Sequence, residues 1–369
     1  MRFGLVLCAT LALGACIDRS HTPAVPAALS VGKPYTVFAA TSRKREPDGS
    51  FGPQRSEHID LLELTVSIPP SHQPGTLEFA YSQPDPATQF TIAERRIFAS
   101  TGGFLKRLKG ALGAMPPDRR EVVVFVHGYN ATQAETAMRA AQLAHDIGLP
   151  GALVVYSWPS RGEILGYAYD NDSMMFARDG LERLLRDLRG VGANNVLLVA
   201  HSMGSVLAME ALRQADIREP GWSARALGAV VLISPDIDID VFRSQMQSLD
   251  PAPAPFFVMI SENDRVLNLS ARLRGTAGRE RLGNIRHAGR VADLPVEVIN
   301  ATAFGRGATS SHFIAATSPA LLAIFNQARV AARSFRYEKL PIEYLLPPEV
   351  WERESATEIR LVRNQISPK

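Results

Sequence analysis

The chain has 369 residues, 46% of them hydrophobic, which excludes a largely disordered protein because such a chain can bury a large core. Its 40 basic residues are nearly balanced by 37 acidic ones, for a formal net charge of +3 at pH 7. This mixed, near-neutral balance favours neither a nucleic-acid-binding protein nor a strongly acidic partner. Any partner must therefore be inferred from a local site.

The amino-terminal residues have the pattern of an export signal. Arg2 supplies a positive charge, and the apolar stretch 3–15 is too short to span a bilayer as a helix. The stretch ends at Leu13-Gly14-Ala15-Cys16, which resembles the lipobox of bacterial lipoproteins. We therefore expect residues 1–16 to be a signal peptide with a lipobox, and Cys16 to carry a lipid anchor. An ordinary signal peptide with an incidental cysteine is the alternative.

Lipidation would place the protein in the bacterial cell envelope, attached to a membrane. Ile17 is not the aspartate associated with inner-membrane retention, so the resemblance favours the outer membrane, facing the periplasm. The other cysteine, Cys8, lies in the expected signal peptide, which leaves the mature chain no thiol for disulfides, metal binding or nucleophilic attack. Residues 17–34 contain three prolines and are expected to form a linker.

Strand-like patterns come first in the expected folded body, residues 35–340. Strands are expected at 35–39, 61–68 and 77–81, separated by turn-rich stretches, and they predict an antiparallel lead-in to a larger sheet. A helix is expected at 104–112.

Strands and helices then alternate. Apolar strands are expected at 122–126, 152–156, 196–200, 229–233, 256–260 and 296–299. Helical patterns are expected at about 132–147, 173–189, 203–215, 238–248 and 318–332. Repeated strand and helix units predict an α/β protein, with a mostly parallel sheet covered by helices on both faces. The tail, 341–369, is mixed and charged, and is expected to be peripheral.

A serine lies where one apolar run ends and the next begins. In VLLVAHSMGSVLAMEAL, residues 196–212, Ser202 occupies the turn between a strand and a helix. A hydroxyl exposed on such a sharp turn requires small residues two positions before and two positions after it. Ala200 and Gly204 fill these positions, and the helix directs its N–H groups at the turn. We expect Ser202 to be a nucleophile, since a helix cap alone would not need both small neighbours.

A nucleophilic serine needs a base and an orienting acid. Ligands bind beyond the carboxyl ends of parallel strands, and with this type of turn the chain order is serine, acid, histidine. After Ser202 the remaining histidines are His287 and His312. His312 is preferred because it follows the last strand, whereas His287 precedes that strand. Asp264, after the strand 256–260, is the preferred acid.

Three other aspartates compete with Asp264. Asp236, Asp238 and Asp240 follow the preceding strand at alternate positions, where they could cap a helix, face water or bind a cation. No glycine-containing calcium loop or bidentate glutamate accompanies them, so neither a metal nor a cofactor is expected.

Two backbone amides are expected to stabilise an oxyanion. One belongs to Met203, directly after the serine, and the other to Tyr129, in His127-Gly128-Tyr129-Asn130 after the strand 122–126. His127 itself is expected to stabilise this loop, because the triad already has its base.

These residues together resemble the α/β-hydrolase superfamily, and within it a bacterial family of uncharacterised hydrolases catalogued as a domain of unknown function. The likeness extends over about residues 37–322 and rests on Phe38 to Arg43, Val66 to Pro69, His127 to Asn130, Ser157 to Ser160, Ala200 to Gly204, and Asn263 to Arg265. The resemblance implies an α/β-hydrolase fold and a serine-hydrolase triad of Ser202, Asp264 and His312. It implies no particular substrate.

The expected activity is hydrolysis of carboxylic esters through an acyl-enzyme, on a small-molecule or lipid ester. A thioesterase or amidase is the nearest alternative, and a non-catalytic envelope lipoprotein that uses the hydrolase scaffold for binding is an alternative of another class. Aromatic residues such as Trp158 and Tyr167 either line an acyl pocket or belong to the core. Six arginines between residues 272 and 290 favour a solvated face over a lipid-headgroup site.

Overall fold

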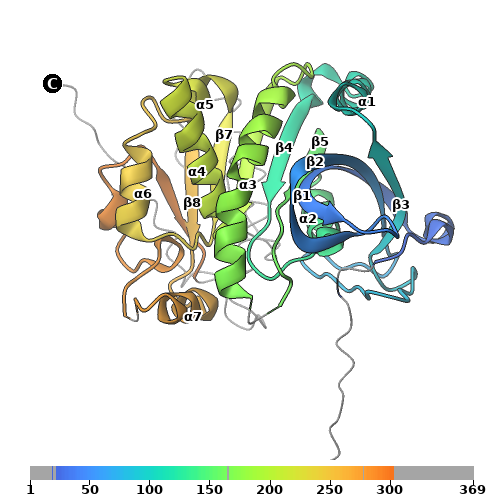
Figure 1. Ribbon diagram of the computed structural model, residues 1–369, viewed down its shortest axis with the longest axis horizontal. Helices are drawn as coiled ribbons and strands as arrows, with labels where there is room; N and C mark the ends of the chain where they lie inside the picture. Colours follow the sequence, from blue (N-terminus) through green and yellow to red (C-terminus); the bar gives the residue numbers. More distant parts are fainter. Residues whose placement is uncertain (1–18, 20–21, 164–165, 277, 303–369) are drawn as a thin grey trace, which may run out of the picture.

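Short, continuous apolar runs form the central strands of one nine-stranded sheet (Figure 1). The structure, a computed structural model, describes residues 19, 22–163, 166–276 and 278–302. Nearly every residue of the central strands is buried, because helices cover both faces of the sheet there.

The sheet is mostly parallel, with antiparallel strands at one edge. Its strand order is β3-β2-β1-β5-β4-β6-β7-β8-β9. At the antiparallel edge, β2 (Phe51–Ile68) pairs with both β1 (Lys33–Arg45) and β3 (Thr91–Phe98). The parallel strands are β4 (Glu121–Val126), β5 (Ala152–Ser157), β6 (Asn195–His201), β7 (Ala229–Ile233), β8 (Phe256–Ile260) and β9 (Glu297–Asn300), and β1 joins them by pairing with β5. The expected α/β class with an antiparallel lead-in is confirmed.

Seven α-helices and four 3₁₀ turns occur in the described residues. The helices are α1 (Thr101–Gly113), α2 (Gln133–Asp146), α3 (Tyr167–Leu188), α4 (Met203–Arg218), α5 (Trp222–Ala226), α6 (Ile239–Met246) and α7 (Arg265–Leu273). The 3₁₀ turns are η1 (Pro26–Ser30), η2 (Pro117–Arg119), η3 (Leu282–Asn284) and η4 (Ala288–Val291).

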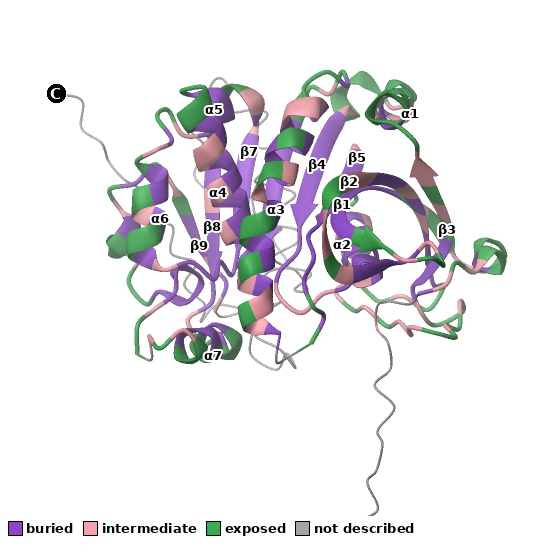
Figure 2. Cartoon of the chain, viewed as in Figure 1, coloured by how far each residue is buried: buried purple, intermediate pink, exposed green. Residues whose placement is uncertain are grey.

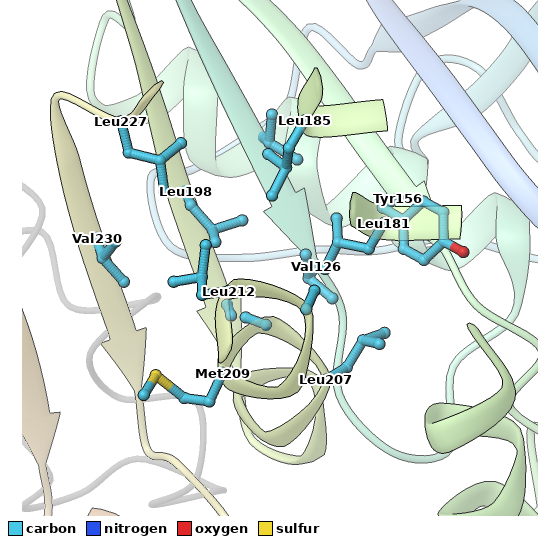
Figure 3. Packing of buried hydrophobic residues seen from close by; sticks show 14 of the residues in the cluster. Val126, Tyr156, Leu181, Leu185, Leu198, Leu207, Met209, Leu212, Leu227 and Val230 are labelled. Atoms are coloured by element: carbon cyan, nitrogen blue, oxygen red, sulfur yellow. The ribbon is translucent and has the colours of Figure 1, made fainter. Parts of the chain in front are cut away.

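The sheet separates two hydrophobic layers because successive residues of a strand point to opposite faces. In β4, Val124 packs in the larger layer with α1, α3, α4 and α6, whereas Val123 packs in the other layer with α2. In the larger layer Leu212 of α4 lies next to Leu198 of β6, and Met209 of the same helix belongs to the same cluster (Figure 3). This packing fixes α4, and with it the turn that precedes the helix, against the centre of the sheet.

Some expected boundaries are wrong. Residues 77–81 do not form a strand: Phe79 makes an isolated bridge with Phe90, and the third antiparallel strand is β3. Prolines and a glycine break up the stretch around 77–81, whereas β3 contains a charged run that hides its strand pattern. Helix α3 begins six residues earlier than expected, and α5 and α7 were not expected. The expected helix at 318–332 and the tail lie outside the described residues.

The expected linker packs on the sheet in its described part. Thr22 is buried, and its carbonyl accepts a hydrogen bond from Arg95 at 3.0 Å. The amide of Val25 donates to Ile92 of β3, and the carbonyl of Ala28 in η1 accepts from Ser67 of β2. Residues 22–34 therefore cover the antiparallel edge instead of forming a free spacer. Across the described ranges, no helix has the length and hydropathy needed to cross a membrane.

Candidate active site

Ser202 adopts a backbone conformation that residues other than glycine rarely take. Its φ is 54° and its ψ is −123°, in a region that costs an ordinary residue about 1–3 kcal/mol. Backbone hydrogen bonds hold it there: the Ser202 amide donates to Ile233 O of β7 at 2.9 Å, and the Ser202 carbonyl accepts from the amides of Ser205 and Asp236. The side chain of Ser202 makes no capping hydrogen bond with α4. The structure therefore does not support the alternative that Ser202 serves as the cap of α4.

Two glycines allow the chain to pack tightly around this turn. A Cβ atom at Gly204 would lie 2.2 Å from the His127 carbonyl oxygen, and one at Gly128 would lie 2.8 Å from the Ser202 Cβ. Real Cβ atoms do not approach other atoms so closely. The loop after β4 is therefore in direct contact with the turn after β6.

The two residues expected to supply oxyanion donors lie at this contact. Met203 is the first residue of α4, so its amide belongs to the first turn, whose N–H groups have no partner within the helix. Tyr129 directly follows Gly128. Its hydroxyl donates to the Glu163 carbonyl at 3.1 Å, and its ring meets Tyr167 edge to face at 5.4 Å between centroids. These contacts fix the Tyr129 side chain against the loop after β5 and the start of α3.

His127 is a structural residue of this loop. Its ring stacks on Trp158 at 4.8 Å, between the carbonyl groups of Gly128 and Trp158, while the Trp158 indole donates to the His127 carbonyl at 2.7 Å. Burial, together with the nearby charge of Arg43, lowers the pKa of His127 to about 3. The imidazole is thus neutral at physiological pH, and its contacts agree with the expected role in the loop.

Sequence reasoning missed two buried charged residues, Asp170 and Arg43, that bind the loops after β4 and β5. Asp170 accepts hydrogen bonds from the amides of Asn130 and Arg161 and from the Ser160 hydroxyl. Burial raises the pKa of Asp170, and these hydrogen bonds and Arg43 oppose that rise. A signal was available, because Ser160 and Arg43 belong to stretches that carry the family resemblance.

Arg43 itself is fully buried in β1. It donates to the carbonyl oxygens of Ala131 at 2.6 Å and Ser160 at 2.8 Å, and to the Ser157 hydroxyl at 3.0 Å. Burial lowers its pKa to about 10, so the guanidinium remains charged at neutral pH. Arg43 ties the loops after β4 and β5 to β1.

Asp264 is fully buried and caps α7, where its Oδ1 accepts from the amides of Val266 at 3.0 Å and Leu267 at 3.1 Å. It lies between β8 and α7, and the carboxyl end of β8 is at the same edge of the sheet as Ser202. This is the position that the sequence predicts for the acid.

The rival Asp236 has other partners. Its carboxylate accepts from Arg281 at 2.8 Å, Ser270 at 2.7 Å and Tyr167 at 2.8 Å, and both Asp236 and Arg281 are buried. Asp238 caps α6 and Asp240 is exposed. Asp236 thus connects α3, α7 and Arg281 through hydrogen bonds, which gives it a structural role.

The remaining predicted residues have varied outcomes. His287 is exposed at the start of η4, as expected for a surface residue. His312 and Cys16 lie outside the described residues, so the complete triad and the lipidation site stay predictions. Within the ranges that the structure covers, no group of three or more His, Cys, Asp or Glu side chains is placed to hold a metal ion.

The fold and the turn at Ser202 together define an α/β hydrolase. A family model described as "Alpha/beta hydrolase of unknown function (DUF900)" matches residues 111–329. The chain therefore belongs to the DUF900 family. No curated protein matches the chain.

Solved structures resemble the chain at low identity. They include lipase B from Aspergillus fumigatus (14% identity, 64% of this chain and 60% of that one, TM-score 0.40). A predicted CIB-like hydrolase from Thermoplasma acidophilum shares 12% identity, over 76% of this chain and 94% of that one, with a TM-score of 0.34. A hyperthermophilic esterase from Pyrobaculum calidifontis shares 13% identity, over 65% of this chain and 95% of that one, with a TM-score of 0.33. The chain thus spans 60% of the length of the Aspergillus lipase that it resembles.

The contact between the two loops predicts the effect of adding one methyl group. Gly204→Ala should destabilise the protein by about 1–3 kcal/mol, because its Cβ must displace the His127 carbonyl. Gly110→Ala is the matched control, since Gly110 lies in α1 with nothing within 4 Å of its added Cβ. The control should stabilise the helix by about 0.5–1 kcal/mol. Urea unfolding measures both changes, and equal stabilities for the two variants would contradict the close approach.

Proposed function

We propose that the protein is a serine hydrolase that cleaves carboxylic esters through an acyl-enzyme, with Ser202 as nucleophile, His312 as base and Asp264 as the orienting acid. The main support is the strained φ of Ser202. The turn around it is packed so tightly that Gly128 and Gly204 have no room for a side chain. Strain of this kind is maintained by the surrounding structure and is concentrated at functional sites.

In the proposed reaction the Ser202 Oγ attacks the ester carbonyl carbon while His312 accepts the hydroxyl proton. The amides of Met203 and Tyr129 donate to the oxyanion of the tetrahedral intermediate. The intermediate collapses as His312 gives its proton to the leaving alkoxide, which departs as the alcohol. Water, activated by His312, then attacks the acyl-enzyme, and the acid is released with Ser202 restored.

Two alternatives remain distinct from this proposal. A thioesterase or amidase would use the same residues and differ in the leaving group. A binding protein on the same scaffold would have no use for the strained serine, which is why we favour catalysis.

We propose further that the chain is lipid-anchored through Cys16 in the bacterial cell envelope, in the outer membrane and facing the periplasm. The support is the stretch Leu13-Gly14-Ala15-Cys16 after a short apolar segment, followed by Ile17. The anchor and the hydrolase proposal are independent of each other.

Removing the nucleophile tests the reaction. Ser202→Ala should abolish hydrolysis of short p-nitrophenyl esters and labelling by a fluorophosphonate, because both need the Oγ. The fold should be preserved, as measured by circular dichroism, since only one oxygen is lost. A fluorophosphonate that labels parent and variant equally, or labels neither, would refute Ser202 as an active nucleophile.

The acid can be tested without disturbing its helix cap. Asp264→Asn should lower kcat by roughly four orders of magnitude, because asparagine holds the wrong imidazole tautomer. Its stability should change little, since asparagine and aspartate cap helices about equally well.

Asp236→Asn is the matched comparison for this variant. It weakens the buried pair with Arg281 and should destabilise the protein, by up to about 3–5 kcal/mol, with a smaller loss of kcat in the folded fraction. Kinetics and urea unfolding of both variants decide the matter. A larger loss of kcat in Asp236→Asn would show that the acid has been misplaced.

The anchor is tested by fractionation. Wild-type protein should remain with membranes at high salt, because acyl chains contribute about 0.8 kcal/mol per buried CH₂ and salt does not screen that contribution. Cys16→Ser, exported with an ordinary cleavable signal, should appear in the soluble periplasm. Release of wild-type protein by salt alone would point instead to electrostatic attachment.

A further inference from the structure

Helix α7 exposes a stripe of apolar side chains. Val266, Leu269 and Leu273 are 36%, 49% and 57% exposed, and their spacing of three and four residues places them on one side of the helix. The adjacent side, with Leu267 and Ala271, is buried against the body. The helix is thus apolar over a wider arc than its contacts with the described residues cover.

Basic residues border this stripe. Arg265 and Arg272 are exposed, and at 100° per residue they lie along the edge of the stripe away from the buried side. Two acidic residues that flank the helix in the chain are less exposed: Asp264 is buried in the cap, and Glu280 faces Arg286 and Arg290 at 3.9 and 3.8 Å. An apolar stripe with a basic border is the pattern of a helix lying in the interface of an anionic bilayer.

Helix α7 lies at the carboxyl ends of the parallel strands, where Ser202 also lies. Ser270 of α7 donates to the Asp236 carboxylate, and the Asp236 amide donates to the Ser202 carbonyl. In Figures 1 and 2 the helix lies below the sheet, on the side toward which the arrow of β4 points, and its outer surface is exposed. A surface that touches α7 would therefore lie close to the candidate active site.

Arg19 holds the amino-terminal segment to this same edge. Its guanidinium donates to Asn130 Oδ1 at 2.8 Å and contacts the Gly162 carbonyl, in the loops after β4 and β5, and it pairs with Glu135 of α2 at 2.6 Å. Cys16 lies three positions before Arg19, so their Cα atoms are at most about 11 Å apart. A lipid on Cys16 would therefore hold the bilayer close to the loops that the Arg19 side chain contacts.

We propose that the edge of the sheet that contains Ser202 faces an anionic lipid bilayer, with α7 resting in its interface and esters carried by membrane lipids as the substrate class. The orientation rests on the proposed lipid anchor, and the substrate class rests on the proposed hydrolase activity. The anchor confines the chain to the surface, so α7 has only to orient it, and a short stripe is enough for that.

A fluorescent label on a single cysteine tests the orientation without relying on activity. The signal peptide contains Cys8, and lipid blocks the Cys16 sulfur, so Leu269→Cys would supply the one free thiol of the mature lipoprotein. The protein is reconstituted in vesicles of phosphatidylethanolamine and phosphatidylglycerol that contain a spin-labelled phospholipid. Ile217→Cys is the control, because Ile217 is 60% exposed near the end of α4 farthest from Ser202.

The label at 269 should be quenched several-fold more than the label at 217. Equal quenching would overturn the proposal, as would failure of the protein to stay with the vesicles. A third outcome would also overturn it: in the soluble Cys16→Ser form, a label at 269 already protected from iodide would mean that residues 303–369 cover α7.

Activity measurements then test the substrate class. Leu269→Glu combined with Leu273→Glu should lower hydrolysis of an ester embedded in the vesicles several-fold and leave hydrolysis of soluble p-nitrophenyl acetate unchanged. Ile217→Glu should change neither rate. Equal losses on both esters would contradict lipid esters as the substrate class. If the parent hydrolyses neither ester, the hydrolase proposal and the proposed substrate class are both wrong. The quenching measurement still tests the orientation, because it does not depend on activity.

Discussion

The close approach of the loop after β4 to the turn after β6 is the constraint on which the rest of the candidate site depends. The two strands pair in parallel with Val126 opposite Ala200, so the segments that follow them meet at once. With only hydrogen at Gly128 and Gly204, the backbones touch, and Ser202 is held at a φ of 54°. The turn can keep this strain because α4 is packed on the sheet by its apolar face.

Buried polar groups hold the neighbouring loops in place. Arg43 and Asp170 each satisfy several backbone groups, and the stacked rings of His127 and Trp158 are joined by hydrogen bonds to main-chain carbonyls. Groups of this kind are costly to bury without partners. Their hydrogen bonds therefore specify one arrangement of the loops, and movement of either loop would leave a charge or a carbonyl unsatisfied.

In the proposed arrangement, the same end of the sheet would combine catalysis with membrane attachment. Asp236 connects the turn at Ser202 to α7 through Ser270, and Arg19 fastens the amino-terminal segment to the loop that contains Asn130. An enzyme anchored close to its own active site gains a high local concentration of membrane substrates. A long flexible spacer would have allowed the site to face any direction, and the packing of residues 22–34 argues against such a spacer.

The sequence by itself determined the alternation of strands and helices, the turn at Ser202 and the need for small residues around it, because periodicity and local steric limits act over a few residues. Only the tertiary structure decided which buried groups support the site. Arg43 meets Ala131 across 88 positions, and Arg19 meets Asn130 across 111. Asp236 and Asp264 each follow one of two neighbouring strands, so sequence position alone separates them poorly. The structure distinguishes them, because the partners of Asp236 come from α3, α7 and Arg281. Contacts between residues so distant along the chain depend on how the strands are ordered in space, which no local pattern encodes.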